Sequence, residues 1–147
     1  ELEAFIKERK VPVTITENHT YDLMQICDVC LAASGTATLE TAMMELPTVL
    51  LYKVSPITYG IGKMVVNLTH VGLPNIVAGK EVIPELLQGD VSVDAIVNTV
   101  LPLLDDLHIN QSMRTELRGV KEKLGESGAV NRVAQLIYDL GKERINE

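Results

Sequence analysis

A strand–turn–helix segment at residues 28–40 (DVCLAASGTATLE) contains the side chains best suited to bind a ligand. An apolar run ends there, the turn Ser34-Gly35-Thr36 follows, and a helical pattern begins at once. Free N–H groups at a helix N-terminus bind phosphate, and a glycine lets the backbone approach a ligand closely. The hydroxyls of Ser34, Thr36 and Thr38 can add hydrogen bonds. The segment is therefore a candidate phosphate-binding turn.

Glu40 follows Thr36 by one helical turn in the same segment. An acidic residue at that distance from a diphosphate can accept hydrogen bonds from ribose hydroxyls, as the acidic residue of dinucleotide sites does at a different spacing. A second interpretation needs no ligand, because Ser or Thr caps and an early Glu also stabilise an ordinary helix N-terminus. The segment alone leaves both interpretations open.

A second informative stretch covers residues 71–88 (VGLPNIVAGKEVIPELLQ). Asn75 follows a proline, as in a loop that wraps a ligand at the end of a strand. Glu81, Glu85 and Gln88 are spaced to share one helix face, if residues 82–88 form a helix. These three side chains then either line a ligand cleft or form the solvated side of an amphipathic helix.

Apolar and β-branched runs alternate with helical patterns along the chain, and most of the strands are continuously apolar. Such strands are typical of a parallel sheet covered on both faces. We predict strands at 11–16, 28–33, 48–52 and 73–78, and helices at 2–10, 20–27, 36–45, 57–67, 82–88, 93–104, 109–125 and 129–144. The expected fold is α/β, a Rossmann-like doubly wound parallel sheet, as a single domain over 1–147 whose residues 92–147 form a helical tail. A ligand should bind beyond the carboxyl ends of the strands.

Composition limits the classes of partner and the kind of core. The formal net charge is −7, which disfavours binding to nucleic acid. Aromatic residues make up only 3% of the chain, so we expect an aliphatic core. The CxxC pair of Cys27 and Cys30 has no second ligand pair at zinc spacing, and we expect buried structural thiols rather than a metal or redox site. The chain opens with Glu1 inside a helical pattern, so we expect it to be part of a longer protein.

The two motifs together, about 35 residues apart, resemble the lipid-A-disaccharide synthase family. The run DVCLAASGTATLETAMMELPTVLLYK (residues 28–53) and the run LPNIVAGKEVIPELLQ (73–88) carry the resemblance. It covers residues 1–105 well and is weaker over the last helices. Members of this family are two-domain glycosyltransferases of the GT-B type, in which the C-terminal domain holds the nucleotide.

The resemblance implies transfer of an acylated glucosamine from UDP-2,3-diacylglucosamine to a lipid monosaccharide phosphate, with release of UDP. It implies that Ser34, Gly35 and Thr36 face the diphosphate and that Glu40 holds the ribose. It also places the second-motif residues in the UDP-sugar cleft (Asn75, Glu81, Glu85, Gln88). No metal and no cofactor are expected. The resemblance also implies an enzyme of the cytoplasm that is either soluble or peripheral at the inner membrane.

Two features of the family are missing from this sequence. These are the Pro-Gly-Ser-Arg loop that touches the UDP-sugar phosphates and the N-terminal acceptor domain, where the general base is expected. We therefore expect the chain alone to be catalytically inactive, and the faces of its last helices to be exposed and to self-associate. The alternatives are a peptidoglycan N-acetylglucosaminyltransferase, a UDP-sugar 2-epimerase, a non-catalytic nucleotide-binding module, or a truncated gene product without a function of its own.

Overall fold

The computed structural model describes residues 2–33, 35–55, 69–125 and 128–145. Its centre is a parallel sheet of β1 (Cys30–Ala33), β2 (Thr48–Tyr52) and β3 (Glu85–Leu87), in the spatial order β1-β2-β3. Helix α3 (Thr36–Met43) connects β1 to β2, and α5 (Leu73–Ala78) precedes β3. The expected parallel α/β architecture is confirmed, with the strands at 28–33 and 48–52 found within two residues of their predicted bounds.

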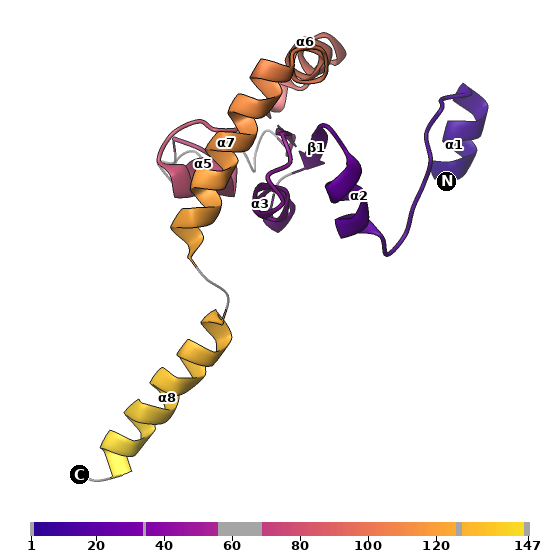
Figure 1. The fold of residues 1–147 in the computed structure, drawn as a ribbon. Coiled ribbons are helices and arrows are strands. Elements are labelled where there is room, and N and C mark those ends of the chain that lie inside the picture. Colours follow the sequence, from indigo (N-terminus) through magenta and orange to yellow (C-terminus); the bar gives the residue numbers. More distant parts are fainter. Residues whose placement is uncertain (1, 34, 56–68, 126–127, 146–147) are drawn as a thin grey trace.

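The remaining helices lie at the two ends of the chain. Helices α1 (Leu2–Arg9) and α2 (Thr20–Ile26) precede the sheet. A short 3-10 helix η1 (Gln88–Asp90), then α6 (Val93–Asp105), α7 (Leu107–Leu124) and α8 (Ala129–Ile145), follow it. In Figure 1, α1 and α8 stand apart from the body formed by the sheet, α3, α5, α6 and α7.

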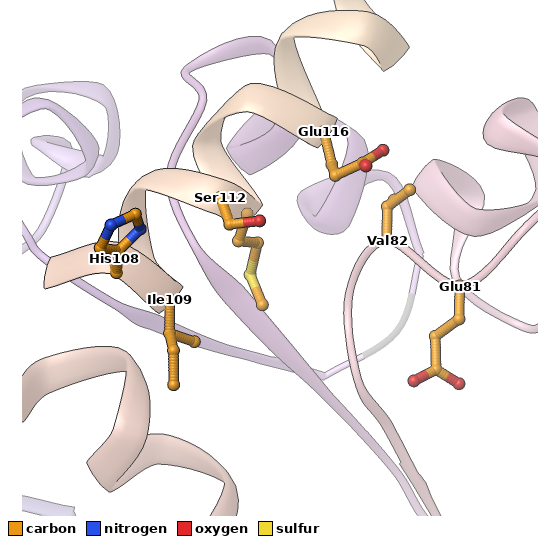
Figure 2. A pocket seen from close by; sticks show the side chains of 7 residues that line it. Glu81, Val82, His108, Ile109, Ser112 and Glu116 are labelled. Carbon is orange, nitrogen blue, oxygen red and sulfur yellow. The ribbon is translucent and has the colours of Figure 1, made fainter. Parts of the chain in front are cut away.

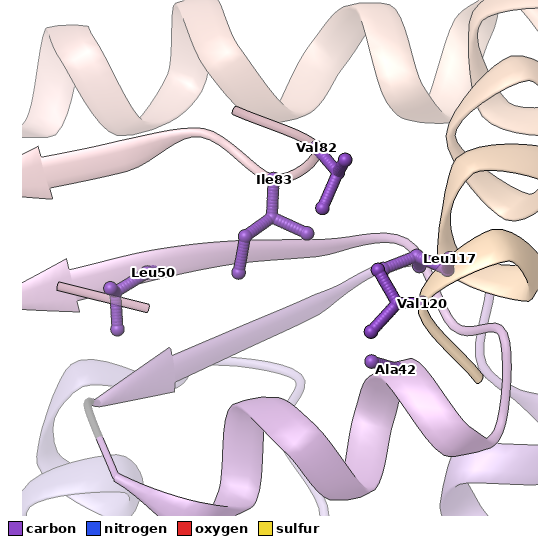
Figure 3. Close-up of a cluster of buried hydrophobic side chains, with 6 residues drawn as sticks. All are labelled: Ala42, Leu50, Val82, Ile83, Leu117 and Val120. Atoms are coloured by element: carbon purple, nitrogen blue, oxygen red, sulfur yellow. The ribbon is translucent and has the colours of Figure 1, made fainter. Parts of the chain in front are cut away.

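The core lies between the sheet and the helices α3, α5 and α7. The buried hydrophobic side chains that cluster there are all aliphatic, as the scarcity of aromatic residues predicted (Ala42, Leu50, Val82, Ile83, Leu117, Val120; Figure 3). Leu117 and Val120 come from α7, which also packs on α6. The predicted helical region after residue 92 is confirmed, and its helix α7 packs against the folded body.

Two predicted elements of the second motif are wrong. Residues 73–78 form helix α5 instead of a strand, because Pro74 suits a first helical turn and Gly79, at φ 74°, ends the helix in the left-handed conformation. The predicted helix at 82–88 is absent, since residues 85–87 pair with residues 50–52 of β2. A parallel ladder with the central strand satisfies backbone groups that a short helix would leave free at its ends.

Two further expectations fail near the N-terminus. Residues 11–16 are not a strand, and Val11, Val13 and Ile15 are exposed. β-Branched residues favour extended backbone, but a strand also needs a neighbour for its N–H and C=O groups. The cysteines are not buried as a pair, since Cys27 is exposed and Cys30 is half-buried, both as free thiols. The predicted helix at 57–67 lies outside the described residues.

Candidate functional site

The three strands end side by side at one edge of the sheet. Ala33 of β1 is level with Leu51, and Tyr52 of β2 is level with Leu87 of β3. The residues that follow these strand ends therefore gather at the same place, which we call the carboxyl edge. The opposite side, where the strands begin at Cys30, Thr48 and Glu85, is the amino edge.

The turn after β1 has a backbone conformation that only glycine adopts readily. Gly35 has φ 94° and ψ −158° and is the N-cap of α3. This N-cap has no side chain to cap the helix, and its carbonyl oxygen accepts a hydrogen bond from the N–H of Thr38 at 3.3 Å. The open end of α3 thus offers backbone donors and the positive end of a helix dipole at the carboxyl edge. Ser34, the first predicted phosphate contact, lies outside the described residues.

The predicted contacts on α3 divide between two faces of the helix. Thr36 is exposed and Glu40 is half-exposed, one turn apart, so both lie on the open face. Thr38 is fully buried, and its hydroxyl donates to the carbonyl oxygen of Gly35 at 2.9 Å. Thr36 and Glu40 are therefore placed to meet a ligand, whereas Thr38 supports the turn from inside.

Gln88 directly follows β3 and lies at the same edge. Its φ of 49° lies in the left-handed region, which is uncommon for a residue other than glycine. Its side-chain oxygen accepts a hydrogen bond from the N–H of Val54 at 3.2 Å. Its side-chain nitrogen is buried without a partner among the described residues. Leaving a buried donor unpaired costs about 1–3 kcal/mol of stability, so this nitrogen is a candidate donor to the acceptor atom of a ligand.

Asn75 has its hydrogen-bonding groups occupied inside the fold. Its Nδ2 donates to the carbonyl oxygen of Ile83 and to Oε1 of Glu85, both at 2.8 Å. Its Oδ1 accepts from the N–H groups of Val82 and Ile83 at 2.7 and 2.9 Å. An amide has two donors and two acceptor positions, so this fully buried side chain has none left for a ligand.

Glu85, the first residue of β3, also has its side chain occupied, by backbone N–H groups just before α5. Its carboxylate accepts hydrogen bonds from the N–H of Val71 at 2.9 Å and of Gly72 at 2.8 Å, besides that of Asn75. A Cβ added at Gly72 would lie 3.1 Å from Oε1 of Glu85, so the glycine permits this close approach. Asn75 and Glu85 thus tie α5 and the segment 82–83 to β3.

Glu81 lies away from the other predicted site residues. It precedes β3 and lines a hollow of about 410 Å³ at the amino edge, between the loop before β3 and the first turns of α7 (Figure 2). The hollow, which we call the amino-edge groove, is lined by Glu81, Val82, His108, Ile109, Ser112, Met113 and Glu116. Glu81 therefore does not share a surface with Glu40 and Gln88, because the predicted helix that would have aligned it with Gln88 is not formed.

A carboxyl group and a thiol outside the carboxyl edge have shifted pKa values. The Arg118 guanidinium, which binds Oε2 of Glu45 at 2.8 Å, lowers the pKa of Glu45, and Lys121 adds to the effect. Burial, and secondarily the nearby Cys27, raise the pKa of the Cys30 thiol, which disfavours the reactive thiolate. The described ranges hold no cluster of three or more His, Cys, Asp or Glu side chains placed to bind a metal ion.

The comparisons with known proteins decide the family. The family model described as lipid-A-disaccharide synthetase matches residues 2–137. The chain belongs to the lipid-A-disaccharide synthetase family. The match includes both motifs, so the carboxyl edge of this family member is built from the segments that carried the resemblance.

Curated relatives give the same result over almost the whole chain. The lipid-A-disaccharide synthase of Geobacter sulfurreducens is 47% identical over 132 residues, which are 89% of this chain and 34% of the relative. The enzyme of that name from Geobacter metallireducens is 42% identical over 90% of this chain and 35% of its own length. The lipid-A-disaccharide synthase of Persephonella marina is 42% identical over 90% of this chain and 36% of its own length. The chain thus spans about a third of the length of these relatives.

Proposed function

We propose that these 147 residues form the UDP-sugar-binding part of a lipid-A-disaccharide synthase. The whole enzyme would transfer diacylglucosamine from UDP-2,3-diacylglucosamine to a lipid monosaccharide phosphate, and release UDP. Family membership supports the reaction class. Nucleotide binding by this part of the chain is supported by two features at one sheet edge: the Gly35 turn, and a buried amide nitrogen of Gln88 that has no partner among the described residues.

The carboxyl edge suggests a distinct role for each residue in that site. The N–H groups at the start of α3, with Ser34, Gly35 and Thr36, bind the diphosphate. Glu40, on the open face of α3, accepts hydrogen bonds from the ribose hydroxyls. Gln88 donates its buried amide N–H to an acceptor atom of the UDP-sugar.

The other predicted contacts act indirectly or not at all. Thr38 holds the Gly35 turn from inside, and Asn75 and Glu85 hold the loops on which β3 depends. Glu81 makes no contact with the UDP-sugar, because it lies at the amino edge.

The chemistry assigned to this edge is stabilisation of the leaving group. The acceptor hydroxyl oxygen forms a bond to the anomeric carbon as the bond from that carbon to the diphosphate oxygen breaks, and the hydroxyl proton passes to a base. Negative charge then grows on the UDP diphosphate, where backbone N–H groups and the α3 dipole stabilise it. We assign no base among the 147 residues, so the chain alone is expected to bind UDP without transferring sugar.

The cellular setting belongs to the same proposal. Among the described residues, none of the helices combines the length and the apolar character that a bilayer crossing needs. We infer from the family that the whole enzyme meets its lipid substrates at the cytoplasmic face of the inner membrane, in contact with the membrane surface and with its own N-terminal domain.

Calorimetric titration of the 147-residue chain with UDP, ADP and CMP tests the site. We expect selective UDP binding that is lost in Glu40→Ala and kept in Glu81→Ala, since Glu81 lies at the opposite edge. Preference for ADP or CMP, or equal losses in the two variants, would contradict the proposed site.

A further inference from the structure

The proposed diphosphate site poses an electrostatic problem for this chain. The chain carries a formal net charge of −7, and a UDP diphosphate is itself an anion. Backbone N–H groups and one helix dipole supply only partial charges. A full positive charge near the diphosphate would offset the repulsion, so the positions of the basic side chains matter.

Several basic side chains are engaged at the amino edge. Arg118 and Lys121 bind Glu45, which lies between α3 and β2. Lys80 pairs with Glu116, on the rim of the amino-edge groove, at 2.6 Å. The charges of these three cations are therefore paired with carboxylates at the end of the sheet opposite the carboxyl edge.

Lys53 is placed differently, at the carboxyl edge itself. It directly follows β2, which is the central strand, and is exposed. It comes one residue after the Tyr52–Leu87 pair of β2 and β3, and two residues after Leu51, which is paired with Ala33 at the end of β1. Within the described part of the chain it forms no ion pair.

The backbone around Lys53 is held on both sides. Tyr52, the residue before it, is paired with Leu87 in the sheet. Val54, the residue after it, donates its N–H to the side-chain oxygen of Gln88. The Cα of Lys53 is therefore fixed at the strand ends, while its ammonium group is free to move on a flexible four-carbon stem. That stem is longer than the spacing between neighbouring strands, about 4.8 Å.

We propose that Lys53 is the cation that binds the diphosphate of the UDP-sugar. The proposal rests on the proposed function of the carboxyl edge and adds a residue to that site. Lys53 acts as a point charge between the α3 N-terminus and Gln88. In the transfer reaction it binds the departing UDP more strongly as negative charge grows there.

Three variants of the 147-residue chain test the role of Lys53 by UDP titration. Lys53→Gln should weaken UDP binding about tenfold, as expected for the loss of one charge-assisted contact. Lys53→Arg should stay within about threefold of the unmodified chain, because it keeps the charge. The matched control Lys80→Gln, which removes a charge at the amino edge, should bind UDP unchanged. Raising the salt concentration should weaken UDP binding less in Lys53→Gln than in the unmodified chain.

The results distinguish a failure of the role of Lys53 from a failure of the nucleotide site. Selective UDP binding by the unmodified chain, with Lys53→Gln within about threefold of it, overturns the role of Lys53 and leaves the nucleotide site standing. Equal losses in Lys53→Gln and Lys53→Arg overturn the charge argument. Absence of UDP binding by the unmodified chain overturns the self-contained site and the role of Lys53 with it. Urea unfolding of each variant shows that the fold is retained.

Discussion

Backbone conformation singles out two residues of the carboxyl edge. Gly35 and Gln88 both have positive φ angles, and they follow strands β1 and β3. Unusual backbone angles cost free energy and gather at ligand sites, where the surrounding structure maintains them. The arrangement of this edge therefore depends on contacts made elsewhere in the fold.

Replacing Gly35 by alanine should destabilise the chain through backbone strain alone. A Cβ at Gly35 would meet no atom within 4 Å, but φ 94° with ψ −158° is poorly accessible to alanine. We expect Gly35→Ala to lower the free energy of unfolding in urea by about 1–3 kcal/mol. Gly89→Ala is the control, since Gly89 has equal room and no positive φ, and it should stay within about 0.5 kcal/mol. Equal effects of the two substitutions would show that the Gly35 turn is not strained.

Removing the Asn75 side chain should cost more than removing any single surface amide. Asn75→Ala leaves the buried N–H groups of Val82 and Ile83 without their acceptor. We expect the free energy of unfolding to fall by about 3–5 kcal/mol in urea titrations. Asn98→Ala, on the exposed face of α6, should change it by less than about 0.5 kcal/mol. A loss below about 1 kcal/mol for Asn75→Ala would contradict the network described for it.

The sequence allowed the polar residues of the second motif to be singled out, but not their roles. Asn75, Glu85 and Gln88 stood out by type, because polar side chains interrupt an apolar stretch. Their roles depend on partners such as Ile83 and Val54, whose positions follow from the sheet. Residue spacing predicts neighbours only when the local structure is known.

At the scale of elements, the structure exchanges helix and strand within the second motif. Residues 73–78 and 82–88 are short, and periodicity does not separate a buried strand from a helix at that length. The decisive signals were Pro74 in the first helical turn and Gly79 at the helix end. By contrast, the strands at 28–33 and 48–52 and the helices from residue 93 onward were predicted well, because their patterns are longer or more strongly apolar.

The ion pairs between Glu45, in the loop after α3, and helix α7 should make stability depend on pH. The pKa of Glu45 is lowered from its ordinary value of 4.5 in the folded chain, first by Arg118. The stabilisation is therefore complete above pH 4.5 and is lost as the pH falls through the lower, folded-state pKa. Arg118→Gln should lower the free energy of unfolding at pH 7 only slightly, because the guanidinium is exposed to solvent.

Urea titrations at pH 7 and at pH values below 4.5 test this sign. The difference between the unmodified chain and Arg118→Gln should shrink as the pH is lowered, since Glu45 becomes protonated in both. Lys7→Gln, in the exposed helix α1, is the control and should show no such convergence. A difference that grows on acidification would contradict the assigned pair.

At the scale of the whole molecule, the two edges of the sheet differ in character. The amino edge has ion pairs and the groove, whereas the carboxyl edge has open backbone donors and an exposed lysine. Parallel strands make this difference possible, because all three end on the same side. That a ligand binds at the carboxyl ends stays a prediction, which follows from the βαβ pattern. The groove depends on how α7 packs, which no local pattern shows.

The exposed stripe on α8 should cause the chain to self-associate. Val130, Val133, Ile137 and Leu140 lie at helical spacing and are exposed by 53 to 82%. Light scattering of the 147-residue chain should show an apparent mass that rises with concentration. The double variant Val133→Glu with Ile137→Glu should remove most of that rise. A monodisperse monomer at all concentrations would contradict the expectation.

The most direct test of the carboxyl-edge site is an NMR titration of the isotope-labelled chain with UDP. We predict that the amide signals that move lie at the strand ends, at Gly35, Thr36, Val54 and Gln88. The amides of Val82 and Ile109, in the amino-edge groove, should stay unchanged. Movement confined to the groove, with the strand-end amides unaffected, would contradict the assignment of UDP to the carboxyl edge.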